Sequence, residues 1–80
     1  MAEPQWRRVA AEIRQRIRDG ADLRERDGRD GRWLPTYPEL EEQHRTSYGT
    51  LRTALLVLEA EGWIDRLPGV GLRVREDHPA

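Results

Sequence analysis

The chain has 80 residues and a mass of 9.4 kDa, which is room for one domain with one small hydrophobic core. It has no cysteine, so neither disulfide bonds nor thiolate metal sites can add to the stability of that core. With 14 arginines against 15 acidic residues the net charge is −1, which excludes a simple polycation that coats nucleic acid. No apolar run approaches the roughly 20 residues of a membrane span, and the first four residues do not resemble a secretory signal. We therefore expect a single cytoplasmic domain over residues 1–80, with no membrane partner.

An amphipathic helix is predicted near the N-terminus. Its apolar residues recur every three or four positions and so share one stripe, which is the face expected to be buried. They are Trp6, Val9, Ala10, Ile13 and Ile17. Pro4 suits the first turn of this helix, and Gly20 is the expected left-handed cap after Asp19.

Residues 21–32 are predicted to be a mobile loop inserted into the domain. Leu23 is the one large apolar residue of this segment, among two glycines and charges of alternating sign. Such a composition cannot bury enough surface to offset the entropy cost of ordering the chain. The alternative is an arm that touches nucleic-acid phosphates. Its arginines would be Arg24, Arg26, Arg29 and Arg32.

Two further helices are predicted, with a tight turn between them. Thr36 and Glu39 have the spacing of a capping box, which starts a short helix that ends around residues 44–45. Ser47 offers the N-cap of a longer helix from about residue 48 to residue 61. Its buried stripe is expected to be Leu51, Ala54, Leu55 and Leu58. Its opposite face is expected to carry Tyr48, Arg52 and Leu56, with Gly49 and Thr53 beside them.

A β-hairpin is predicted after Gly62. Residues 63–67 and 72–75 alternate between apolar and polar side chains, and the glycine-containing segment 68–71 joins them. Residues 76–80 are polar and expected to fray. The order of these elements predicts a mainly α fold with a small β-hairpin wing, namely a winged helix-turn-helix of three helices and a two-stranded wing. In that fold the second helix of the pair enters the major groove of DNA, and the wing follows phosphates or the minor groove.

A series of short motifs follows in this part of the sequence. They are Leu34-Pro35-Thr36, Glu39-Leu40, Thr50-Leu51-Arg52, Ala54-Leu55, Glu61-Gly62-Trp63-Ile64 and Gly69-Val70-Gly71. In this order they resemble the DNA-binding domain of the GntR family of bacterial transcription regulators, over about residues 5 to 75. Three positions in the helices and the turn depart from the family pattern, and in the wing Leu72 and Arg73 replace the usual Thr-Phe. Pro38 stands where an arginine is expected, Tyr48 replaces the arginine after Ser47, and Arg45 occupies a turn position usually held by glycine.

The resemblance implies DNA contacts at Ser47, Thr50, Arg52 and residues Gly69, Val70 and Gly71. The chain's own pattern adds further candidates for the DNA surface: Thr36, Tyr48, Gly49, Arg66 and Arg73. Alternatives remain for several of these. Arg52 could form a surface ion pair with Glu59 or Glu42, Ser47 could serve only as a helix cap, and the wing arginines could serve only solubility.

No arrangement for catalysis is found. His44 and His78 lack partners at metal-ligand spacing, and Ser47 has no base assigned to it. We therefore expect a protein that is not an enzyme and that takes no metal, cofactor or small-molecule effector. The expected function is sequence-specific binding of duplex DNA by a nucleoid-associated transcription regulator that lacks an effector domain, with a homodimer as an option. The alternative is a winged-helix module that binds another regulator protein, because Leu56 and Val57 are apolar and Pro38 and Tyr48 replace DNA-contacting residues.

Overall fold

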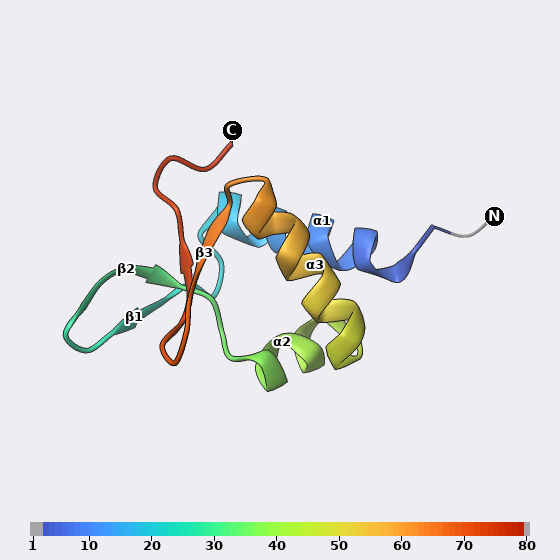
Figure 1. Ribbon diagram of the computed structural model, residues 1–80, viewed down its shortest axis with the longest axis horizontal. Helices are drawn as coiled ribbons and strands as arrows, with labels where there is room; N and C mark the ends of the chain where they lie inside the picture. Colours follow the sequence, from blue (N-terminus) through green and yellow to red (C-terminus); the bar gives the residue numbers. More distant parts are fainter. Residues whose placement is uncertain (1–2, 80) are drawn as a thin grey trace.

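The elements follow one another in the order expected for a winged helix, with one additional hairpin. The computed structural model describes residues 3–79. The elements are α1 (Gln5–Asp19), β1 (Arg24–Arg26), β2 (Arg29–Trp33), α2 (Tyr37–His44), α3 (Tyr48–Ala60), β3 (Ile64–Leu67) and β4 (Gly71–Val74). Figure 1 shows the helices on one side of the molecule and the strands on the other. The prediction of three helices followed by a hairpin wing is confirmed.

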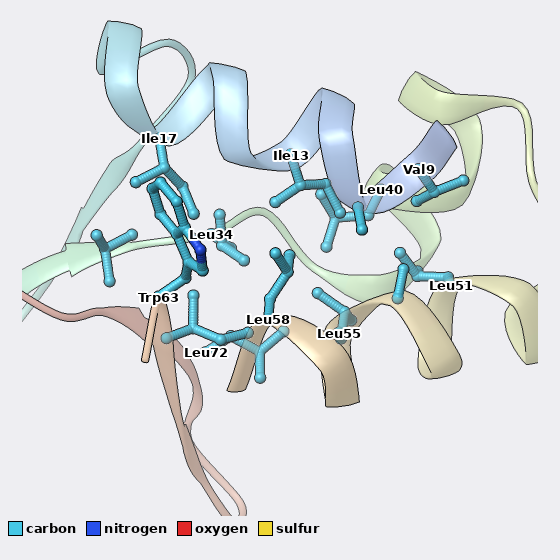
Figure 2. Close-up of a cluster of buried hydrophobic side chains, with 14 residues drawn as sticks. Val9, Ile13, Ile17, Leu34, Leu40, Leu51, Leu55, Leu58, Trp63 and Leu72 are labelled. Atoms are coloured by element: carbon cyan, nitrogen blue, oxygen red, sulfur yellow. The ribbon is translucent and has the colours of Figure 1, made fainter. Parts of the chain in front are cut away.

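The core lies between α1 and α3. The predicted stripes of both helices are buried, and Trp63, Ile64, Leu72 and Val74 extend the same cluster toward the wing. Figure 2 shows the side chains of α1 pointing toward those of α3, with Trp63 and Leu72 closing the end near Ile17. Gly20 caps α1 in the left-handed conformation, as expected, with φ of 68°. Among residues 3–79, no helix combines the length and the apolar character that crossing a membrane requires.

The prediction that residues 21–32 form a loop is wrong for most of that segment. Strands β1 and β2 form an antiparallel hairpin, and β2 pairs with β4 of the wing. The wing hairpin β3–β4 has the two strands that we predicted, and β1 and β2 extend it into a four-stranded sheet of order β1-β2-β4-β3. The loop prediction counted only the apolar surface of the segment. It missed that backbone pairing and the buried ring of Trp33, at the end of β2, hold these otherwise exposed strands.

The turn between α2 and α3 has an unusual conformation for its sequence. Arg45 ends α2 with φ of 48° and ψ of 57°, a left-handed conformation that costs a non-glycine residue about 1–2 kcal/mol. The preceding residue, His44, is buried and its Nδ1 lies 2.8 Å from Glu12 Oε1 of α1. Arg8 of α1 donates to the His44 carbonyl at 3.0 Å. These contacts tie the end of α2 to α1 and thereby fix where α3 begins.

The C-terminal segment predicted to fray has no helix or strand over residues 76–79, and Ala80 lies outside the described residues. It nevertheless contacts the body of the domain. The His78 ring stacks on Trp63, with ring centroids 5.0 Å apart and an interplanar angle of 13°.

Candidate nucleic-acid interface

The exposed face of α3 is formed by the residues that the sequence placed opposite its buried stripe. They are Tyr48, Gly49, Arg52, Thr53 and Leu56. Tyr48 is 56% and Leu56 is 42% exposed, which makes them the two exposed large hydrophobic residues of the described chain. Because α3 packs on α1 through the other flank, this face is open to a partner over the length of the helix.

Arg52 lies at the centre of this face and has no partner among residues 3–79. It is exposed and forms no hydrogen bond or ion pair within the described chain. The alternative of an ion pair with Glu59 is wrong, because the Glu59 carboxylate accepts from Arg66 at 3.3 Å instead. No pair with Glu42 forms either. The Arg52 guanidinium is thus available to an external anion or hydrogen-bond acceptor.

The N-terminal end of α3 is suited to an anion. Ser47 caps the helix by accepting from the Thr50 amide at 3.4 Å, and its hydroxyl donates to Thr50 Oγ1 at 3.2 Å. Thr50 is half-buried, and the first turn carries no acidic residue that would neutralise the partial positive charge of the helix end. The exposed side chain of Arg45 lies just before this end and has no partner in the described part of the chain. Sequence patterns flagged Arg45 only as a departure from glycine, and not as a candidate for binding.

Arg66, which we predicted as a wing contact for DNA, is held by contacts within the domain. It is half-buried, and its Nη1 donates to the Tyr37 hydroxyl at 2.9 Å, while its Nε donates to Glu59. The pKa of Arg66 is raised, first by the hydrogen bond to Tyr37 and then by the Glu59 carboxylate. The Tyr37 ring in turn contacts Tyr48, with centroids 5.5 Å apart. Arg66 therefore joins the wing to α2 and α3. No local pattern indicates this contact, because it links residues that are 29 positions apart.

The turn of the wing exposes backbone groups and carries no charged side chain. The Val70 amide donates to the Leu67 carbonyl at 2.9 Å, and Gly69 has φ of 73°, as a type II turn after Pro68 requires. Pro68 and Gly69 are exposed, and Val70 is half-buried. Gly71, also predicted as a contact, has φ of 149° and closes the turn at the start of β4.

The outer face of the wing hairpin carries two arginines, Arg73 and Arg75, that already have partners. Arg73 lies 3.7 Å from Asp65, and Arg75 makes two hydrogen bonds of 3.0 Å to Asp77 and lies 3.6 Å from Asp65. Arg73 also lies over the ring of Trp33, at 6.0 Å from its centroid. The predicted wing contact at Arg73 would therefore have to exchange an internal ion pair for an external one.

The capping box predicted at the start of α2 is present. Thr36 accepts from the Glu39 amide, and its own amide donates to Glu39 Oε1 at 3.1 Å. Arg24 of β1 binds the same carboxylate at 2.6 and 2.7 Å. The hydrogen bond from Arg24, followed by those from Thr36, lowers the pKa of Glu39 from 4.5 to about 2. Thr36 is exposed, but its polar groups serve the cap, and the contact also anchors the β1–β2 hairpin to α2.

Within residues 3–79, no group of three or more histidine, cysteine, aspartate or glutamate side chains is arranged to hold a metal ion. The site is instead an exposed helix face beside a sheet. The exposed face of α3, the first turn of α3 and the turn of the wing each leave a donor free for an external ligand.

Comparisons with known proteins identify the family. The model of the bacterial regulatory proteins, gntR family, matches residues 5–74. The structure of the DNA-binding domain of AraR in complex with operator ORX1 is 28% identical, with a TM-score of 0.75 over 92% of this chain and 82% of that chain. The N-terminal domain of AraR in complex with mutant ORR3 is 28% identical, with a TM-score of 0.74 over 94% of this chain and 99% of that chain.

A further similar structure is YydK, a possible transcriptional regulator from Bacillus subtilis subsp. subtilis str. 168. It is 27% identical, with a TM-score of 0.75 over 95% of this chain and 30% of that chain. None of the curated proteins matches the chain. Since the family model spans nearly the whole described sequence and the fold agrees, the chain belongs to the gntR family of bacterial regulatory proteins and has its winged helix-turn-helix fold.

Proposed function

We propose that this protein binds duplex DNA in a sequence-specific manner, with the exposed face of α3 in the major groove and the turn of the wing against the backbone or minor groove. The free guanidinium of Arg52 on that face is the observation that carries the proposal. The similarity to the AraR DNA-binding domain solved in complex with operator ORX1 supports binding to DNA. A transcription regulator that works in this way acts in the cytoplasm, at the nucleoid.

Arg52 has the chemistry for base or phosphate recognition. A guanidinium grips guanine O6 and N7, or one phosphate, through two parallel hydrogen bonds. Tyr48 and Leu56, one helical turn to either side, supply a hydroxyl for phosphate and an apolar surface for a thymine methyl. Gly49 has no side chain beyond a hydrogen and Thr53 has a small one, so they do not project beyond Tyr48 and Leu56. A Cβ added at Gly49 would meet nothing within 4 Å. A duplex can therefore approach this side of the helix closely.

Phosphate contacts are proposed at both edges of this face. Ser47 and the first-turn amides of α3 favour an anion, and Arg45 adds a free cation beside them. On the other edge, the exposed Gly69 presents one backbone N–H, which needs no side-chain charge to meet a phosphate. Residues 34–75 hold 5 arginines and 6 acids, so one copy neutralises few phosphates. Two copies on a two-fold symmetric site would increase the number of contacts.

The experiment begins with selection of a binding duplex from a randomised 24-base-pair library, followed by a polarisation titration over a range of salt concentrations. Arg52→Ala is expected to lower the affinity for the selected duplex by about 5- to 150-fold, the range for losing one bidentate contact. Arg16→Ala is the matched control, because Arg16 lies on α1 and the variant makes the same change in charge. Failure to select any duplex, or equal effects of the two variants, would contradict the proposal.

A second candidate function is supported by the 42% exposure of Leu56 beside the half-buried Val57. Both side chains could belong to a surface for another regulator protein. In that case Leu56→Ser would abolish capture of the partner, while the wild-type protein would show no salt-dependent binding to any selected duplex. A steep dependence of DNA affinity on salt would instead assign this face to DNA.

A further inference from the structure

The arginines of the β1–β2 hairpin have different surroundings, so the hairpin is not a uniform basic arm. Arg24 is bound to the Glu39 carboxylate of α2. Arg29 and Arg32 are exposed and have no partner in the described part of the chain. Arg26 alone among them reaches the turn of the wing, where its Nη1 donates to the carbonyl of Val70. This contact joins residues that are 44 positions apart in the sequence.

The side chain of Arg26 also covers a buried aromatic ring. Its guanidinium lies 5.4 Å from the centroid of Trp33, within the range of a cation–π interaction. Trp33 pairs with Arg73 of β4 and so lies on the outer face of the sheet, outside the main core cluster. It is nevertheless only 1% exposed. Arg26 and Arg73 thus enclose the ring, and the ring in turn fixes the position of the Arg26 guanidinium.

The start of β4 is shaped for this contact. A Cβ added at Gly71 would lie 2.9 Å from Arg26 Nη1 and 3.6 Å from Cε3 of Trp33. Because Gly71 has no side chain, Arg26 of the β1–β2 hairpin can reach the turn of the wing. Figure 1 shows the β1–β2 hairpin beside the β3–β4 hairpin, which agrees with the strand order of the sheet.

We propose that Arg26 is a positioning residue that holds the turn of the wing, residues 67–71, in the conformation that meets DNA. Within the turn the Val70 amide donates to the Leu67 carbonyl, and Arg26 adds a tether from outside the wing hairpin. A turn that is already ordered loses less entropy when it binds. This inference rests on the proposed function, since it assumes that the wing contacts DNA.

The first test needs no DNA. Amide hydrogen exchange is measured by NMR at Val70 and Gly71 in the free wild-type protein, in Arg26→Ala and in Arg26→Lys. The proposal expects several-fold faster exchange at these two amides in Arg26→Ala, and recovery in Arg26→Lys, because a lysine can also donate to the Val70 carbonyl. Arg29→Ala is the matched control, since Arg29 lies opposite Arg26 in the hairpin and its side chain makes no hydrogen bond or ion pair with the wing.

The second test measures binding to the duplex selected above. Arg26→Ala is expected to weaken affinity by about tenfold, the cost of ordering roughly one more residue on binding. The slope of log affinity against log salt is expected to stay unchanged, because Arg26 releases no phosphate counterion. A direct phosphate contact would instead lower that slope by about 0.9.

The outcomes separate the two proposals. Unchanged exchange at Val70 and Gly71 in Arg26→Ala would overturn the positioning role, whatever the DNA result. Faster exchange at core amides such as Leu55 by the same factor would also overturn it, because the loss would then be global. A salt slope that falls by about 0.9 would make Arg26 a phosphate contact and not a positioning residue. If the wild-type protein binds no duplex, the proposed function fails, while the exchange result still shows whether Arg26 holds the turn.

Discussion

The exposed face of α3 and the outer face of the wing hairpin both carry arginine, but the two faces leave their arginines in different states. Arg52 on the helix has no partner in residues 3–79. Arg73 and Arg75 on the sheet are paired with Asp65 and Asp77. An exposed ion pair contributes little to stability, yet it occupies the donors that a DNA phosphate would need. The number of arginines on a surface is therefore a poor guide to where DNA binds, because it does not show which guanidinium groups are already occupied.

One face of α3 can be free for a ligand only if the opposite face of the helix is buried in the core. Leu55 is 0% exposed and lies between α1 and α3. We expect Leu55→Ala to lower the free energy of unfolding by about 2–5 kcal/mol, as truncation of a buried leucine does. Urea denaturation followed by circular dichroism measures this directly. A loss below about 0.5 kcal/mol, the size of a surface substitution, would mean that this flank is not the core.

Arg66 is a second kind of wing arginine, because it is bonded to two helices of the domain. Its hydrogen bonds to Tyr37 and Glu59 join three elements. We expect Arg66→Met to destabilise the fold by about 1–2 kcal/mol, from the loss of charge-assisted hydrogen bonds at a half-buried position. Thermal unfolding of this variant and of Arg52→Ala can be compared side by side. Arg52→Ala should leave stability unchanged, and equal losses in the two variants would remove the distinction.

Arg45 is expected to show opposite effects on stability and on binding. Its left-handed conformation is strained for arginine, whereas glycine adopts it at little steric cost. Arg45→Gly should therefore stabilise the protein by about 1 kcal/mol. The same change should weaken DNA binding and lower the salt slope by about 0.9, since it removes one free cation beside α3. Denaturation of this variant measures the change in stability, and a salt titration measures the change in DNA affinity. A gain in stability with unchanged binding would exclude Arg45 from the interface.

The smallest expected effect concerns the anchor between the hairpin and α2. The pKa of Glu39 is lowered from 4.5 to about 2, with the hydrogen bond from Arg24 as the largest cause. A carboxyl group whose pKa is lower in the folded state contributes stability above pH 4.5, and this contribution is lost as the pH falls toward 2. We expect Arg24→Ala to raise the pKa of Glu39, as followed by the ¹³C shift of its carboxylate. An unchanged titration curve would show that the ion pair does not form in solution.

Much of the fold could be predicted from the sequence because its signals are local. The spacing of Leu51, Leu55 and Leu58 marks the buried flank of α3, and Thr36 with Glu39 marks the start of α2. The β1–β2 hairpin could not be predicted in this way. Its strands have little apolar surface, and they are held by pairing with β4 and by contacts that span up to 44 residues.

The same limit applies to the candidate site. Periodicity placed Arg52 on the exposed face correctly, since that depends on the helix alone. Whether an arginine of the sheet is free depends on which acid the fold brings beside it. Arg66 illustrates this, because its partners Tyr37 and Glu59 come from two different helices.

The most direct test of the account is an NMR titration of the ¹⁵N-labelled protein with the selected duplex, observing backbone amides and the Nε–H groups of the arginines. We predict the largest chemical-shift changes at Arg52 and along the exposed face of α3. Smaller changes are expected at Gly69, and little change at Arg73 and Arg75. Large shifts at Arg73 and Arg75 with none at Arg52 would contradict it.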